Sequence, residues 1–188
     1  MYIYLSRKIK VSAVFVMALT VFIYSYGTSD TFFMLLASFV HEFGHISASL
    51  LCGAKTEEIL IGFGGADIKK AGITSYKEDI LIFFGGIFAN VLSFLLFPKT
   101  PFGTYSLAYA VLNAVPAETL DGGRVIYSLL YPHFERRAEI FCRILSFISL
   151  FVLWQMSVYI LFKTGENFSL FLFCLCLFAS VTDEEHGQ

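Results

Sequence analysis

Six apolar segments, separated by short polar stretches, constrain the fold of this chain more than any other feature. They cover approximately residues 11–26, 31–52, 80–97, 104–115, 140–162 and 168–181. A membrane-spanning helix needs about 17–25 mainly apolar residues. Only 15% of the residues are charged, against about a quarter in an average soluble domain. We therefore expect an all-α integral membrane protein with about six transmembrane helices, of which the fourth and the sixth are short.

The placement of Lys and Arg predicts how these helices are oriented. If the amino terminus lies in the cytoplasm, six spans return the carboxy terminus to the same side. Eleven of the 13 Lys and Arg residues then fall on the cytoplasmic side, and only Lys99 and Lys163 fall outside. Short loops rich in Lys and Arg remain in the cytoplasm. The sequence thus predicts a multi-pass protein with both termini in the cytoplasm.

Length and charge narrow the organisation and the class of partner. A chain of 188 residues is expected to form a single domain, here one polytopic membrane domain over residues 1–188. The net charge of −2 is uninformative about nucleic acid, but the absence of a basic tract that could hold phosphates argues against a nucleic-acid partner. The longest polar loop, residues 53–79, contains a run at residues 58–65 that reads as a short strand or hairpin ending in a glycine turn. On the predicted topology this loop is cytoplasmic.

The second apolar segment contains the motif His41-Glu42-Phe43-Gly44-His45. Residues four apart lie on one face of a helix, so both imidazoles point the same way and can occupy two positions of a tetrahedral Zn²⁺. Glu42 can hold a water molecule as general base. Ionisable groups inside a span are costly unless they are paired, metal-bound or facing water. A zinc site is therefore favoured over two buried structural histidines.

Zinc needs a third protein ligand, and Asp121 is the candidate. His133 and His186 lie in a loop and in the polar tail, whereas Asp121 follows the fourth segment. Pro116 and the glycine pair after Asp121 predict irregular backbone, which is tolerated at membrane depth where it lines a cavity. A carboxylate there would complete a His₂Asp site with one position left for water. A helix cap at the membrane surface is the alternative role for Asp121.

Two other functions are compatible with these features. The polar groups could form the transport site of a metal transporter, or the chain could be a non-enzymatic metal-binding membrane protein. No inverted repeat is visible, and a transport site has no need for Glu42 directly after His41. A metalloprotease is therefore the favoured prediction.

The motifs resemble those of the site-2 protease family of intramembrane zinc metalloproteases, and most closely the compact branch that processes a sigma-factor precursor during bacterial sporulation. Family members combine H-E-x-x-H with an N-x-x-P-x-x-x-x-D-G type segment, here Asn113 to Gly122. Two weaker similarities lie between them, Phe63-Gly64-Gly65 and the G-P-x-x-N type element at residues 85–90. The resemblance covers about residues 35–130, with Thr119 and Gly86 where the family has prolines.

The resemblance implies a function and a set of site residues. His41, His45 and Asp121 would bind one Zn²⁺ per chain, Glu42 would activate water, and Asn113 and Pro116 would shape the substrate groove, with Asn113 as a donor to the oxyanion. The substrate would be a membrane-tethered protein, such as a sigma-factor precursor, cut near the cytoplasmic face of a bacterial membrane. Since only seven residues follow Val181, we expect no PDZ or CBS domain, so regulation would fall to other proteins such as inhibitory membrane proteins.

Overall fold

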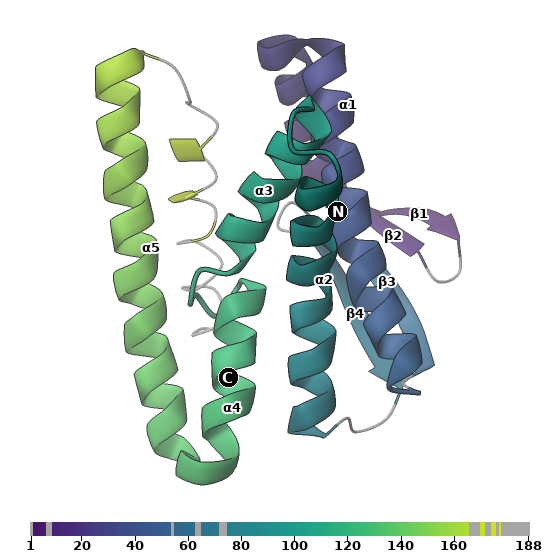
Figure 1. The fold of residues 1–188 in the computed structure, drawn as a ribbon, viewed down its shortest axis with the longest axis vertical. Coiled ribbons are helices and arrows are strands. Elements are labelled where there is room, and N and C mark those ends of the chain that lie inside the picture. The colour runs from purple at the N-terminus through teal and green to yellow at the C-terminus, as the bar shows by residue number, and fades with distance from the viewer. Residues whose placement is uncertain are drawn as a thin grey trace. The chain divides into compact units, whose positions relative to one another are not determined.

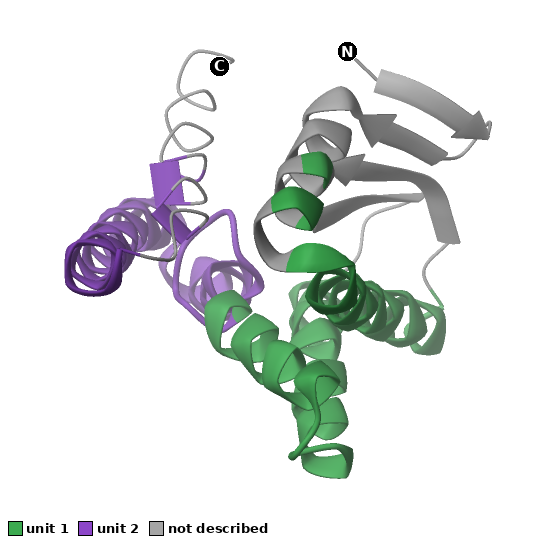
Figure 2. Ribbon diagram, turned by 90° about the horizontal axis from the view of Figure 1, so that it is seen from above, with its two compact units in different colours: residues 1–113 green, residues 114–188 purple. Residues whose placement is uncertain are grey.

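The computed structural model describes the backbone of residues 2–6, 9–53, 55–62, 65–71, 75–165, 170–171, 174–175 and 177. The chain divides into two compact units, Met1–Asn113 and Ala114–Gln188, which are coloured separately in Figure 2. The prediction that the whole chain forms one protease domain stays a prediction.

The described residues of the first unit form three helices and four strands (Figure 1). The helices are α1 (Ala13–Leu51), α2 (Tyr76–Leu96) and α3 (Pro101–Asn113), and they pack against one another pairwise. The strands pair in the order β1-β2-β3-β4, with β2 and β3 parallel and the other neighbours antiparallel. Their bounds are β1 (Tyr2–Ser6), β2 (Ile9–Ser12), β3 (Lys55–Gly62) and β4 (Gly65–Ala71). The side chains of the strand predicted near residues 58–65 lie outside the described residues.

A glycine divides α1 into two helical parts. Gly27 has φ +81° and ψ 171°, a backbone conformation that side-chain-bearing residues rarely adopt. The hydroxyl of Thr31 donates to the Gly27 carbonyl at 2.7 Å and satisfies one group at the break. The part that carries His41, Glu42 and His45 therefore begins at Gly27 as a helix of its own.

Three helices among the described residues are long and apolar enough to cross a membrane. They are Gly27–Leu51, Tyr76–Leu96 and Arg136–Thr164, and they match the second, third and fifth predicted segments. Large apolar side chains such as Phe39, Leu81 and Phe147 are exposed on them, as expected for helices that face lipid. The fourth segment forms α3, which is too short to span by itself, and the sixth lies largely outside the described residues.

Small residues bring α1 and α2 into close contact. A Cβ atom added to Gly44 would collide with the Gly85 carbonyl oxygen and lie 2.8 Å from the Cβ of Ala89. A Cβ on Gly85 would lie 2.8 Å from the Cβ of Ala48. The two helices thus present small residues four apart, Gly44 with Ala48 and Gly85 with Ala89, a spacing that allows membrane helices to approach closely. Gly44 therefore allows α2 to approach the helix that carries the histidines.

The second unit contains α4 (Asp121–Phe134) and α5 (Arg136–Thr164), which lie side by side (Figure 1). Only Glu135, with φ +44°, separates the two helices. The basic residues in 131–139 suggest a polar loop, but these residues are helical apart from Glu135. Charged residues are good helix formers on an exposed face, and Pro132 lies in the last turn of α4.

Gly122 and Gly123 provide space rather than flexibility. A Cβ on Gly122 would collide with the Ala114 carbonyl oxygen, and a Cβ on Gly123 would collide with that of Ala117. Residues 114–120 therefore fold back onto the first turn of α4. Ala117 and Leu120 anchor this segment in a buried cluster with Leu150 and Leu177.

Candidate metal centre

The helix beginning at Gly27 brings His41 and His45 together on one buried face. Their side chains are 5% and 7% exposed, although both residues are polar and lie within a candidate membrane span. The rings are perpendicular, with an interplanar angle of 89° and centroids 4.6 Å apart. The Nε2 atoms of the two rings face each other at 3.0 Å. The four-residue spacing thus produces the paired arrangement that the sequence predicts.

The separation of these two nitrogens fits a metal ion. Two ligands bound at about 2.0–2.1 Å to a tetrahedral zinc ion lie about 3.3 Å apart. The Nε2 atoms therefore need to separate by only a few tenths of an ångström to bind one ion. Imidazole nitrogen is also a preferred ligand for zinc. The donor set and its spacing both suit Zn²⁺.

Residues of helix α2 lie within hydrogen-bonding distance of the Nδ1 atoms of both imidazoles. The Nδ1 atom of His45 donates to the Ile82 carbonyl oxygen at 2.8 Å, which leaves its Nε2 lone pair directed away from α2. Nδ1 of His41 lies 3.3 Å from the side-chain amide of Asn90, which is completely buried. Hydrogen bonds of this kind orient metal-binding histidines and select their tautomer.

Gly86 lies between these two contacts and directly against the rings. A Cβ there would collide with the His45 ring and come within 2.8 Å of Cε1 of His41. Ile82, Gly86 and Asn90 are spaced four apart, so they form one stripe along α2. The absence of a side chain at Gly86 therefore lets α2 approach the histidine pair closely.

Glu42 and Tyr109 lie next to the histidines. Glu42 is half-buried on α1, and Tyr109 of α3 lies within electrostatic range of its carboxylate. The centroid of the Tyr109 ring is 6.3 Å from that of the His41 ring. Sequence reasoning missed Tyr109. The available signal was its position four residues before Asn113, on the same face of a short helix.

Asn113, the predicted oxyanion donor, is the last residue of α3. Its Nδ2 atom donates to the Tyr109 carbonyl one turn earlier, at 3.1 Å. This bond uses one of the two N–H groups of the amide, and the role of Asn113 as oxyanion donor stays a prediction.

Asp121 and Pro116 belong to the second unit. Asp121 is 7% exposed and is the first residue of α4, where the helix dipole stabilises a carboxylate. Pro116 is half-buried in the segment before it, which is held to α5 by a hydrogen bond from the Glu118 backbone N–H to the Ser146 hydroxyl at 3.0 Å. The irregular backbone thus ends just before Asp121, and the role of Asp121 as third ligand stays a prediction.

Comparison with known proteins establishes the family. Residues 11–115, more than half of the chain, match the family described as peptidase M50B-like. The chain belongs to this family. No curated protein matches it significantly. Among solved structures it is similar to the site-2 protease from Methanocaldococcus jannaschii, with a TM-score of 0.68 and 17% identity over 98% of this chain and 94% of that one. At that identity the structural match shows the fold.

These findings confirm the main predictions from sequence. The resemblance to site-2 proteases and the metalloprotease activity are confirmed, and M50 peptidases depend on zinc. Family membership and the three apolar helices make this M50B-like peptidase an integral membrane protein. The H-E-x-x-H motif lies in one of the candidate membrane spans, Gly27–Leu51. The sporulation branch stays a prediction.

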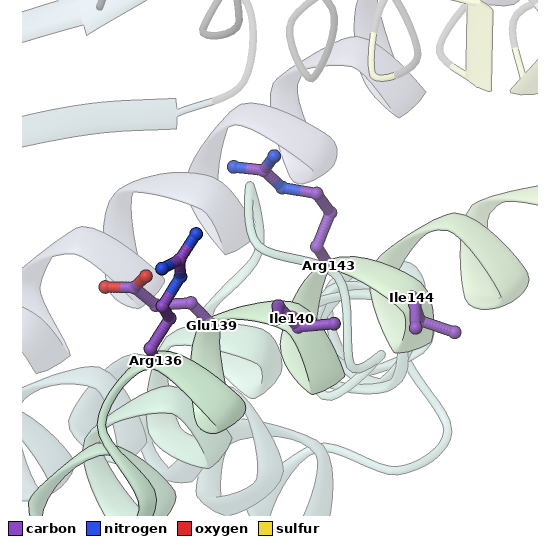
Figure 3. A pocket seen from close by; sticks show the side chains of 5 residues that line it. All are labelled: Arg136, Glu139, Ile140, Arg143 and Ile144. Atoms are coloured by element: carbon purple, nitrogen blue, oxygen red, sulfur yellow. The ribbon is translucent and has the colours of Figure 1, made fainter.

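A separate pocket lies on the second unit of the M50B-like peptidase, on the first turns of α5 (Figure 3). Its volume is about 400 Å³, and it is lined by Arg136, Glu139, Ile140, Arg143 and Ile144. None of the predicted catalytic or metal-binding residues lines it. Its arginines lie at the end of a candidate span, where side chains meet lipid headgroups, so we assign it no part in the reaction.

The close packing of α1 on α2 leads to a testable prediction. Gly44→Val should push α2 away from the histidines, because its side chain would overlap the Gly85 carbonyl. Overpacking of this kind costs about 1–3 kcal/mol. We expect a lower melting temperature in detergent and a lower zinc content for the purified protein. Phe43→Val is the matched control, since Phe43 is 59% exposed. Wild-type stability and zinc content in Gly44→Val would contradict the packing argument.

Proposed function

We propose that this M50B-like peptidase is an intramembrane protease that cuts a membrane-tethered protein near the cytoplasmic face of a bacterial membrane. The observation that carries the proposal is the histidine pair, buried in a candidate span with two Nε2 atoms 3.0 Å apart. One zinc ion would be held by His41, His45 and Asp121. The buried Asp121 carboxylate and the family's dependence on zinc support this ligand set.

The proposed reaction divides the work among a few groups. Zinc, when bound, lowers the pKa of water towards about 7 and polarises the scissile carbonyl. Glu42, next to His41 on α1, takes the proton of the attacking water and passes it to the leaving amine. Asn113 donates an amide N–H to the oxyanion, and Pro116 shapes the groove beside it. Tyr109 is a further candidate for substrate contact, because it lies beside both His41 and Glu42.

The proposal extends to membrane topology and substrate. Six spans with cytoplasmic termini would place His45 nearer the cytoplasm than His41, so cleavage falls towards that face. A helical substrate must unwind before it is cut, and the edge of the strands after α1 is a surface to which an extended segment can pair. A sigma-factor precursor is the proposed substrate, and membrane proteins are the proposed inhibitors.

Cleavage by the purified protein in liposomes tests this function. The substrate is a single-span reporter with a Gly- and Asn-containing helix, and an otherwise identical Leu-only reporter is the control. We expect cleavage of the first reporter within its span, loss of cleavage with 1,10-phenanthroline, and recovery on adding Zn²⁺. Metal analysis should find one zinc per chain. Cleavage that is insensitive to the chelator, or confined to residues outside the bilayer, would contradict the proposal.

A further inference from the structure

We propose that Asn90 is a positioning residue for the metal centre, holding His41 through Nδ1 so that Nε2 binds the ion. The inference rests on the proposed role of His41 as a zinc ligand. Asn90 has no exposed surface and belongs to α2, while His41 lies 49 residues earlier on α1. A buried amide in a candidate membrane span is costly unless its polar atoms are used. Among the described residues, the side chain of Asn90 forms its hydrogen bond with His41.

One proton arrangement satisfies the three contacts around the two rings. An Asn90 Nδ2–H would donate to His41 Nδ1, His41 Nε2–H to His45 Nε2, and His45 Nδ1–H to the Ile82 carbonyl. Amide orientations and tautomers follow from such networks, because hydrogens are not seen directly. In this arrangement His45 already offers a lone pair at Nε2. His41 does not, because its Nε2 carries the proton.

Metal binding therefore requires the other tautomer of His41. Its proton must leave Nε2 and a proton must be taken up at Nδ1, so the ring stays neutral. The Nδ1–H group then needs an acceptor on α2. The Oδ1 atom of Asn90 is buried and has no hydrogen-bond partner among the described residues. A half-turn of the amide exchanges Nδ2 for Oδ1 at the same place, since the two ends have nearly the same shape.

This exchange explains why an amide occupies the position. A side chain with both a donor and an acceptor can satisfy either tautomer of His41, whereas an apolar side chain satisfies neither. Gly86, one turn earlier on α2, keeps the helix close enough for the contact. The stripe of Ile82, Gly86 and Asn90 thus supports His45 by a backbone carbonyl and His41 by a side chain.

Zinc affinity of the full-length protein in detergent, measured by competition with a chromogenic chelator, tests the proposal. Losing an outer hydrogen-bond partner of a zinc ligand weakens binding about 10–100-fold. We expect that loss for Asn90→Leu and, should this variant not fold, for the smaller Asn90→Ala. Asn90→Asp retains an acceptor for Nδ1–H and should bind zinc as tightly as wild type. Ser93→Ala is the control, because the Ser93 hydroxyl bonds to its own helix at Ala89.

Nuclear magnetic resonance of ¹⁵N-histidine provides a readout that a packing role would not change. Zinc-loaded wild type and Asn90→Asp should show a protected Nδ1–H on His41, and Asn90→Leu should lose that protection. Wild-type affinity in Asn90→Leu, or an Asn90→Asp variant as weak as Asn90→Leu, would overturn the assignment of Asn90. Wild-type affinity in His41→Ala would instead show that the zinc site itself is misassigned.

Discussion

Replacing Glu42 by Gln should lower the rate of substrate cleavage by about 10²–10⁴-fold, the usual contribution of a general base. Gln keeps the size and the hydrogen-bonding capacity of Glu but cannot accept the proton of the attacking water. Zinc binding should persist, because the predicted ligands are unchanged. The measurement is cleavage of a tagged membrane-tethered substrate on coexpression, together with the zinc content of each purified protein.

Glu139→Gln is the matched control for this experiment. Glu139 is an exposed carboxylate on α5 and lies outside the predicted catalytic set. Its substitution should leave both cleavage and zinc content at wild-type values. If Glu42→Gln cleaves as fast as wild type, Glu42 is not the general base. If it loses zinc, Glu42 has a structural or ligand role in place of a catalytic one.

The second large effect is expected at Asp121. Asp121→Ala should lower zinc affinity by more than the roughly 10–100-fold typical of losing an outer hydrogen-bond partner, because a direct ligand would be removed. Cleavage should fall below detection at cellular zinc concentrations. Chelator competition gives the affinity, and the coexpression assay gives the activity.

Asp30→Ala provides the comparison for Asp121. Asp30 is an exposed carboxylate near the start of the helical part of α1 that carries the histidines. Its substitution removes a carboxylate without removing a predicted zinc ligand. Unchanged zinc affinity in Asp121→Ala would assign Asp121 to its alternative role at the helix terminus, where it stabilises the first turn of α4. A lower melting temperature of the zinc-free protein would then be the remaining effect.

The structure also gives Gly86 a packing role and corrects two expectations. The lack of a side chain at Gly86 is what allows α2 to reach the histidine rings. The glycines after Asp121 were expected to loosen the chain, but each accommodates a carbonyl group of the preceding segment. Residues 131–139 were expected to form a loop, yet they continue α4 and begin α5 around Glu135.

Local sequence patterns were enough to predict that this protein is a membrane metalloprotease with paired histidines. Apolar runs indicate membrane helices, and the four-residue spacing of His41 and His45 predicts that they share one helix face. Both features can be read from the sequence because each depends only on residues close together in the chain. The residues of α2 that contact the histidine rings could be identified only from the tertiary structure. Ile82 and Asn90 lie 37 and 49 residues from the rings that they contact, and no local pattern encodes which helix face packs there. That choice depends on the close fit of α1 against α2 through small residues, which exists only in the folded protein.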